Sequence, residues 1–338
     1  MGKELPNERP ATSSSSSKVV QTKKVTVDEV MSKLSSVNFD SAQRDTDALS
    51  QISKLDELTK SGDLSLWKAA VTGSANTGSP APLRTYPVSL EFMSSRTNGL
   101  ITGDTLGVGS ENEVTLDDFK DATIAVVLGC SIGGVASLAF LPENVGATLC
   151  YFFALTPILF IGVGSSAPGV IAGAIAQFKG TADDKVKRER RVCAHEAGHF
   201  LCGYLCGLPV KGYSITDEGY PCVEFHSSSD ADAITARREF TSEEIAALSV
   251  VALSGSVAEI LSFGQAKGGE NDLLELDNLL RRSKEFVGAQ KQQDLTRWGA
   301  LTSYNLIKSN MQKYEKLVDA FQSRKSVAEC IAVLEATE

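Results

Sequence analysis

The chain has 338 residues, a formal net charge of −9 and an isoelectric point near 5.1. Hydrophobic residues make up 42% and charged residues 22% of it, which allows a sizeable core and excludes a wholly disordered or collagen-like chain. The acidic balance argues against a protein whose main task is to bind nucleic-acid phosphates. Seven cysteines without a C-x-x-C pair favour a reducing compartment over a disulfide framework.

Residues 1–25 are expected to form a disordered tail. They are polar, contain five consecutive serines and have no apolar h-region of the kind found in secretory signals. The serine-rich and basic character also fits an organellar presequence, but Glu4 and Glu8 count against that interpretation.

Residues 26–118 are expected to hold helical patches and an irregular connector. The polar start signal Thr26–Glu29 precedes apolar residues at helical spacing, and helical patches run to about Ala70. The stretch Thr72–Asp118 is rich in Gly, Ser, Thr, Asn and Pro, so we expect little regular structure there beyond short strands around Tyr86–Phe92.

Two long uncharged runs predict a membrane segment over residues 119–178. Ala122–Leu141 has no charged residue and is long enough to cross a hydrocarbon core of about 30 Å. Pro142 interrupts the apolar sequence, and Val145–Phe178 then continues without charge. An unbroken helix over this second run would be about 51 Å long, which exceeds one straight crossing. We therefore expect two crossings, at about 122–141 and 145–164.

The flanking sequence sets the expected topology. Ser165–Gly169 is the natural break, after which Val170–Phe178 lies at the interface or dips back into the bilayer. Two crossings place both polar parts of the chain on one side of the membrane. The basic residues that follow favour the cytoplasm-like face: Lys179, Lys185, Lys187, Arg188, Arg190 and Arg191. The alternative is a helical hairpin buried inside a globular core.

The sequence H-E-A-G-H at residues 195–199 is the motif that carries chemistry. Positions i and i+4 of a helix share a face, so His195 and His199 can bind one metal ion. Glu196 lies beside them, where it can act as the general base on an activated water. We predict a zinc site on a helix that ends at Gly207–Pro209; the alternative is a helix with two histidines that bind no metal.

A catalytic zinc needs a third protein ligand. A metzincin would have its third histidine at position 205, which is Leu205, so that class is excluded. Cys202 and His226 are weaker candidates, because a packed cysteine or a polar residue at a strand end explains each equally well. The residues alone leave five carboxylates open as candidates: Glu259, Glu270, Asp272, Glu275 and Asp277.

An ordered series of segments resembles the peptidase domain of FtsH-type zinc metalloproteases. The segments are H-E-A-G-H at 195–199, L-S-G-S-V-A-E at 253–259 followed by Phe263-Gly264, G-G-E-N-D-L at 268–273, and R-W-G at 297–299. The resemblance covers about residues 190–310. It implies one catalytic Zn²⁺ held by His195, His199 and Asp272, with Glu196 as the catalytic base.

The pattern of elements agrees with a peptidase-like domain over residues 179–310. Val210–Thr216 and Tyr220–His226 are typical of short strands around a turn, and an exposed strand edge beside the zinc could hold an extended peptide by backbone pairing. Thr241–Glu244 is a capping box that opens an apolar helix closed by Gly264. The fold class we expect is mainly α: a transmembrane helical hairpin followed by an α-rich, FtsH-like peptidase domain with a small β-hairpin.

The chain departs from the FtsH pattern because it carries no ATP site. No G-x-x-x-x-G-K-[ST] sequence occurs in it, the membrane segment directly precedes the peptidase motif, and Ser256 replaces the family's usual Arg. This arrangement is similar to the AAA-less FtsH-like membrane proteins of plant and algal chloroplasts. The resemblance implies an integral protein of the thylakoid or envelope with its peptidase domain on the stromal side; the mitochondrial inner membrane is the alternative.

The expected function is that of a membrane-anchored zinc endopeptidase that cuts unfolded or loosely folded proteins. Its expected partners are the lipid bilayer, protein or peptide substrates, and a separate AAA unfoldase or other subunits of a membrane complex, but no nucleic acid. The main alternative is a non-proteolytic scaffold or assembly subunit, and a weaker one is a membrane anchor with a structural zinc. Residues 311–338 are expected to form a helical tail that packs on the domain or on a partner.

Overall fold

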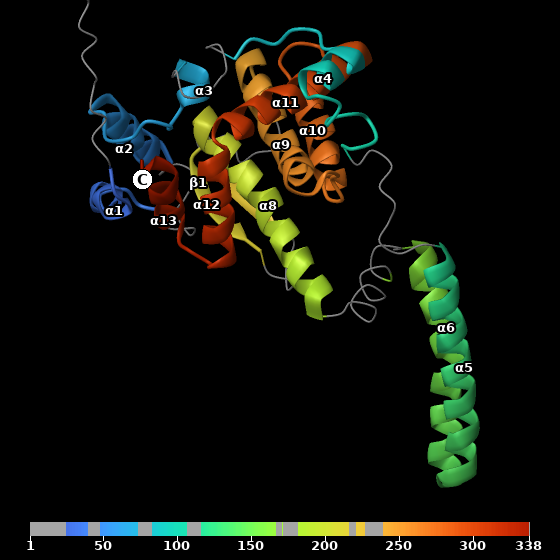
Figure 1. Ribbon diagram of the computed structural model, residues 1–338. Coiled ribbons are helices and arrows are strands. Elements are labelled where there is room, and N and C mark those ends of the chain that lie inside the picture. Colours follow the sequence, from blue (N-terminus) through green and yellow to red (C-terminus); the bar gives the residue numbers. More distant parts are fainter. Residues whose placement is uncertain are drawn as a thin grey trace, which may run out of the picture.

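A computed structural model describes residues 25–39, 48–73, 83–106, 116–166, 171, 182–215, 221–226 and 239–337. This part of the chain is mainly helical with one small antiparallel sheet, as the sequence predicts (Figure 1). Residues 1–24 of the tail expected over residues 1–25, and all of the expected interfacial segment 170–178 except Ile171, lie outside the described residues. Val25, the last residue of the expected tail, is described and its N–H donates to the Thr337 hydroxyl.

The elements follow one another in the order α1 Val27–Leu34, α2 Ala48–Lys60, α3 Ala69–Thr72, α4 Leu90–Arg96, α5 Leu116–Phe140, α6 Glu143–Ser166, α8 Ala182–Cys206, β1 Val210–Ser214, β2 Cys222–Phe225, α9 Ser242–Phe263, α10 Glu270–Arg281, α11 Ala289–Ser309, α12 Met311–Gln322 and α13 Val327–Glu335.

Local signals fix several of these boundaries. The predicted capping box is present at the start of α9, where Thr241 exchanges hydrogen bonds with Glu244. The polar start signal before α1 is also a capping box, formed by Thr26 and Glu29. Helix α9 ends at Gly264, whose φ of +82° is a left-handed conformation that glycine adopts without strain. The helix boundaries predicted from these residues are confirmed.

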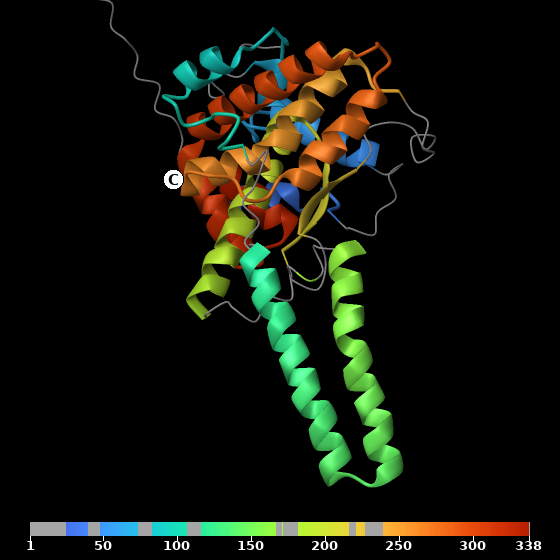
Figure 2. The same cartoon turned by 90° about the vertical axis from the view of Figure 1, so that its right-hand side faces the viewer.

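Helices α5 and α6 form a hairpin that extends away from the rest of the chain (Figures 1 and 2). Pro142 lies between them, as predicted, and the helices approach closely where a Cβ on Gly146 would lie 2.5 Å from the Ser137 carbonyl oxygen. Large apolar side chains point outward along the hairpin, including Phe140 at 85% and Tyr151 at 74% exposure. Such a surface fits a hydrocarbon environment and is unfavourable in water.

Among the described residues, three helices are long and apolar enough to cross a membrane: Phe119–Phe140 within α5, all of α6, and all of α9. Only 11% of the apolar window of α5 and 6% of that of α6 is buried, whereas 72% of the window of α9 is buried inside the helical body. The hairpin therefore fits a membrane protein, and the alternative of a hairpin buried in a globular core is wrong. Helix α9 is a central core helix.

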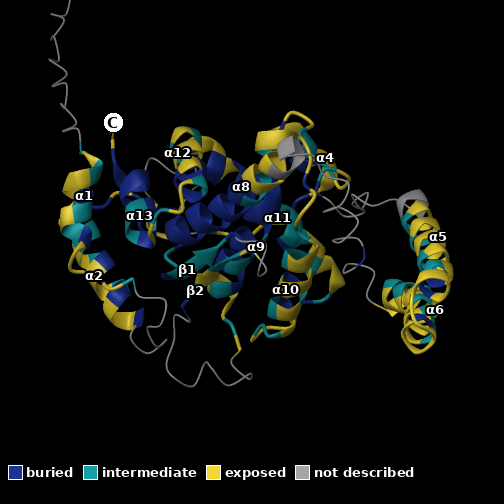
Figure 3. Cartoon of the chain, turned by 90° about the horizontal axis from the view of Figure 1, so that it is seen from below, coloured by how far each residue is buried: buried dark blue, intermediate teal, exposed yellow. Residues whose placement is uncertain are grey.

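The remaining helices form one body around α8 and α9, which Figure 3 shows as its buried centre. Helix α9 packs against α8, α10 and α11, while α12 packs against α8 and α13. The sheet lies against α8, and β1 runs antiparallel to β2 with Tyr213 opposite Val223. The two predicted strands are confirmed; the turn expected at Asp217–Gly219 lies outside the described residues.

The segment around Tyr86–Phe92 differs from the expectation of short strands. Residues 84–89 form no strand, and Leu90–Arg96 forms helix α4, which Ser89 caps by accepting a hydrogen bond from the Phe92 backbone N–H. Helix α4 packs on α11, where Met93 is fully buried. The apolar residues here belong to a short helix that packs on the body. The alternation of apolar and polar residues in so short a segment does not distinguish a helix from a strand.

One hydrophobic core joins three segments that are far apart in sequence. It includes Leu34 before the hairpin, Phe200 after it and Phe321 near the C-terminus, all at most 1% exposed. Apolar residues of the expected C-terminal tail are also buried here, so they pack on the body itself: Tyr314, Leu317, Val318 and Phe321.

Glu335 ties the three segments together. Its buried carboxylate accepts hydrogen bonds from the Ser65 and Leu66 backbone N–H groups at 2.6 and 2.9 Å and from the Tyr204 hydroxyl at 2.9 Å. The Tyr204 ring also contacts Trp67, with 5.2 Å between ring centroids. A buried carboxylate satisfied in this way links α13 and α8 to the chain that precedes the hairpin.

Because the parts of the chain before and after the hairpin share one core, both must lie on the same side of a membrane. We therefore predict that epitope tags at residues 12 and 338 are digested by protease from the same face of sealed vesicles, while a tag inserted at Asn144 is protected. Detergent should expose the third tag. Digestion of the two terminal tags from opposite faces would contradict the shared core.

Candidate metal centre

Helix α8 places His195 and His199 one turn apart on the face that packs against α9. The two side chains are buried, with 8% and 9% of the residue exposed, and their rings meet nearly edge to face with 4.8 Å between centroids. The i, i+4 spacing predicted this shared face, and the crossing of α8 with α9 buries it.

The far nitrogen of each ring is held by α9. Nδ1 of His199 lies 2.8 Å from the Val251 carbonyl oxygen, and Nδ1 of His195 lies 2.7 Å from Oε1 of Glu259. A carbonyl and a carboxylate are acceptors, so each Nδ1 carries the proton and donates it. In the neutral rings, both Nε2 atoms therefore present lone pairs.

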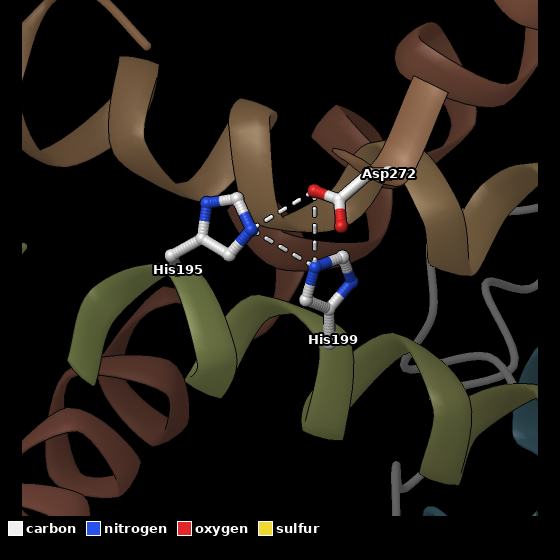
Figure 4. Close-up of side chains that lie close together, drawn as sticks. All are labelled: His195, His199 and Asp272. Carbon is white, nitrogen blue, oxygen red and sulfur yellow. Dashed lines mark hydrogen bonds and ion pairs between the residues drawn. The ribbon is translucent and has the colours of Figure 1, made fainter. Parts of the chain in front are cut away.

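Asp272 in the first turn of α10 completes the cluster (Figure 4). Its Oδ2 lies 2.9 Å from Nε2 of His195 and 3.4 Å from Nε2 of His199, and the two Nε2 atoms are 3.0 Å apart. Ligands about 2.1 Å from a tetrahedral ion are about 3.4 Å apart, so these three atoms nearly have the spacing of three corners of a zinc site.

Three electron-pair donors so close together need a positive charge between them. Burial alone lowers the pKa of His195, but hydrogen bonds to Asp272 and Glu259 outweigh it and raise that pKa to about 10. Burial raises the pKa of Asp272, yet hydrogen bonds from His195 and then His199 hold it well below its ordinary value. The cluster thus stabilises bound cationic charge, whether protons or a metal ion.

The donor set and its surroundings fit a zinc ion. Two imidazole nitrogens and one carboxylate oxygen leave a fourth position for water or substrate, as in catalytic zinc sites. Gly255 of α9 lies directly beside them, since a Cβ there would be 2.4 Å from Nε2 of His195 and 2.5 Å from Nε2 of His199. Only glycine leaves room for the converging nitrogen atoms.

The Glu259 carboxylate accepts several hydrogen bonds besides the one from His195, and no sequence pattern predicted them. Its buried carboxylate accepts from the backbone N–H groups of Lys267 and Gly268 at 3.0 and 3.1 Å and from Nη1 of Arg191 at 2.8 Å. Burial raises its pKa, but His195 and then Arg191 outweigh this effect and lower it. Glu259 therefore stays ionised and orients His195, instead of serving as the third ligand.

Glu196 lies beside the cluster and is 4% exposed. The Val223 backbone N–H in β2 donates to its carboxylate, whereas Oε2 has no hydrogen-bond partner among the described residues. Burial is the largest influence on its pKa and raises it, although His199 and His195 act in the opposite direction. A buried carboxylate with one free oxygen and a raised pKa suits a general base.

The other sequence candidates lie outside the cluster. Within the part of the chain that the structure describes, the only group that could hold a metal ion is His195, His199 and Asp272. Cys202 is buried in the core, where burial raises its thiol pKa and keeps it protonated. His226, Glu270, Glu275 and Asp277 do not join the group. The roles of Val251 and Arg191 could not be predicted from the sequence, because only the tertiary fold brings Val251 to His199 and Arg191 to Glu259.

Comparison with protein-family models, with curated proteins and with solved structures finds no match to this chain.

Replacing Gly255 with Ala should remove zinc binding, because the added methyl group would occupy the space at the two Nε2 atoms. Gly103→Ala is the matched control, since a Cβ at Gly103 meets no atom within 4 Å. Zinc content of the purified variants, with circular dichroism as a check on folding, measures the effect. Full zinc occupancy in a folded Gly255→Ala variant would contradict the assignment.

Replacing Glu259 with Gln should weaken zinc binding by roughly 10–100-fold, the usual effect of losing a group that orients a metal-bound histidine. The amide would remove the negative charge and place a donor opposite the N–H groups that now bind the carboxylate. Competition with a chelator of known affinity measures the change. Glu270→Gln, an exposed substitution in the first turn of α10, should leave the affinity unchanged.

Proposed function

We propose that this chain is a membrane-anchored zinc endopeptidase of FtsH type that lacks its own ATPase module. One observation carries the proposal: a buried cluster of His195, His199 and Asp272 lies beside Glu196, whose Oε2 is free to accept a proton. A zinc held only for structure is normally closed by four protein ligands. Three ligands with a neighbouring base support hydrolysis instead.

The residues of this chain divide the work of peptide hydrolysis between them. A zinc ion held by His195, His199 and Asp272 would supply a Lewis acid for the scissile carbonyl and the attacking water. Glu196 accepts the proton of that water at Oε2 and transfers it to the nitrogen of the leaving amine. Glu259 keeps the Nδ1 proton of His195 in place throughout, which holds the ring in the ligand orientation.

Strand β2 supplies a place for the substrate. Its Val223 N–H already points toward Glu196, so the strand runs past the base. In the described residues β2 pairs only with β1, which leaves its other edge without a strand partner. An extended peptide can pair with such an edge through backbone hydrogen bonds, and this favours loosely folded chains of varied sequence as substrates.

The proposal includes a location and partners. We place the protein in a chloroplast membrane, thylakoid or envelope, with the peptidase body on the stromal side, or alternatively in the mitochondrial inner membrane. The FtsH-like sequence series and the exposed apolar hairpin support this placement. Substrates that are folded would need a separate AAA unfoldase, because this chain has no phosphate-binding loop of its own.

Replacing Glu196 with Gln should abolish cleavage and keep the metal. Loss of a general base lowers the rate by roughly 10²–10⁴-fold, while the ligand atoms stay in place. The measurement is casein cleavage together with zinc content, in the full chain purified in detergent. Glu189→Gln, an exposed position on the same helix, serves as the matched control and should cleave like the unchanged protein.

A non-proteolytic scaffold subunit is the second candidate, and the absence of a phosphate-binding loop favours it. The two functions separate in the organism: a scaffold keeps its biological effect in the Glu196→Gln variant, whereas a protease loses it. Zinc-containing unchanged protein that cleaves no unfolded substrate would count against the endopeptidase.

A further inference from the structure

A second feature of the body is an open pocket of about 390 Å³ between strand β1 and the turn from α12 to α13. We call it the β1–α13 pocket. None of its lining residues belongs to the metal centre. They are Phe39, Lys211, Gly212, Tyr213, Ser214, Ile215, Arg324, Lys325, Ser326 and Val327. Three are cationic and none is acidic, so the pocket has the charge of an anion site.

Neighbouring acids offset this charge only in part. Arg324 Nη2 lies 2.8 Å from Oε1 of Glu189, and Lys211 Nζ lies 3.7 Å from Oε2 of Glu224, but these side chains are 33–56% exposed, so water partly screens both pairs. Glu329 is the acid nearest in sequence to Lys325. Its carboxylate accepts from the N–H and hydroxyl of Ser326, 2.8 and 2.7 Å away.

The start of helix α13 also borders the pocket. Val327 is the first residue of this nine-residue helix and lines the pocket. A capping box already occupies part of the helix end, because Ser326 Oγ accepts from the Glu329 N–H and the Glu329 carboxylate accepts from the Ser326 N–H. The N–H groups of Val327 and Ala328 have no acceptor within the helix. Arg324, Lys211, Lys325 and this helix end therefore line one space, a combination that suits a phosphate group.

The pocket lies beside the part of the body that leads to the hairpin. The Arg324–Glu189 contact joins it to the N-terminal half of α8, about 10 Å along the helix from Ala182. Lys187, Arg188 and Arg190 are exposed on this same stretch of α8. In Figure 2 the first turns of α8 and the hairpin lie toward the same end of the body. The exposed basic residues of α8 therefore lie at the end of the body that is nearest to the hairpin, where the surface of a bilayer would be.

We propose that the β1–α13 pocket binds the phosphate-bearing headgroup of an anionic lipid and holds the body against the membrane surface that the hairpin enters. Cationic side chains next to a membrane attract anionic lipids, and the three cationic lining residues favour a phosphate headgroup over an acyl chain. Docking through this pocket would fix the orientation of the body relative to the bilayer.

The test uses the full chain, purified in an uncharged detergent. Three probes are titrated by calorimetry: short-chain phosphatidylglycerol, short-chain phosphatidylcholine and inorganic phosphate. We expect phosphatidylglycerol to bind at least about tenfold more tightly than either of the others. This preference should vanish in the triple variant Lys211→Gln, Arg324→Gln, Lys325→Gln.

The matched control removes the same number of charges from another part of the body, in Arg281→Gln, Lys284→Gln, Lys291→Gln, and should keep the preference. Equal loss in both triple variants, or equal affinity for the two lipids, would overturn the proposal. Inorganic phosphate that binds as tightly as phosphatidylglycerol would make this a site for a free anion and would also overturn it.

If circular dichroism shows that the first triple variant is unfolded, Lys325→Gln alone should still weaken phosphatidylglycerol binding severalfold, and an unchanged affinity there would refute the proposal.

Discussion

The close approach of helices α8 and α9 is the constraint on which the candidate metal centre depends. A Cβ on Gly198 of α8 would lie 2.5 Å from the Ser254 carbonyl oxygen of α9, so the two backbones are nearly in contact. At this distance the Nδ1 atom of His199 reaches a main-chain carbonyl of α9. That hydrogen bond sets the tautomer, the tautomer directs the lone pair of Nε2, and the lone pair then faces Asp272. The chemistry of the site follows from how tightly two helices pack.

Patterns that lie within one element could be predicted from the sequence. The H-E-x-x-H spacing placed His195 and His199 on one face, the capping box at Thr241 fixed the start of α9, and the uncharged runs on either side of Pro142 defined the hairpin. Each of these signals lies within one helix or one apolar segment. Helix periodicity and the length of an apolar segment are reliable guides at that range.

Contacts between elements could not be predicted in the same way. From the residues alone, Glu259 and Asp272 were two of the five carboxylates that could supply the third ligand. They differ only in where the tertiary fold places them: Glu259 lies at Nδ1 of His195 and Asp272 at Nε2. For the same reason, no local pattern indicated that the chain before the hairpin packs against α8 and α13.

The two ends of the body meet, and this has a consequence for how the protein is made. The Val25 N–H donates to the Thr337 hydroxyl, the Thr337 N–H donates back to the Val25 carbonyl, and α1 packs on α13. The first segment therefore cannot find its partner until the ribosome has released residue 337. Both apolar spans emerge long before that, so their insertion into the bilayer can precede the pairing of α1 with α13.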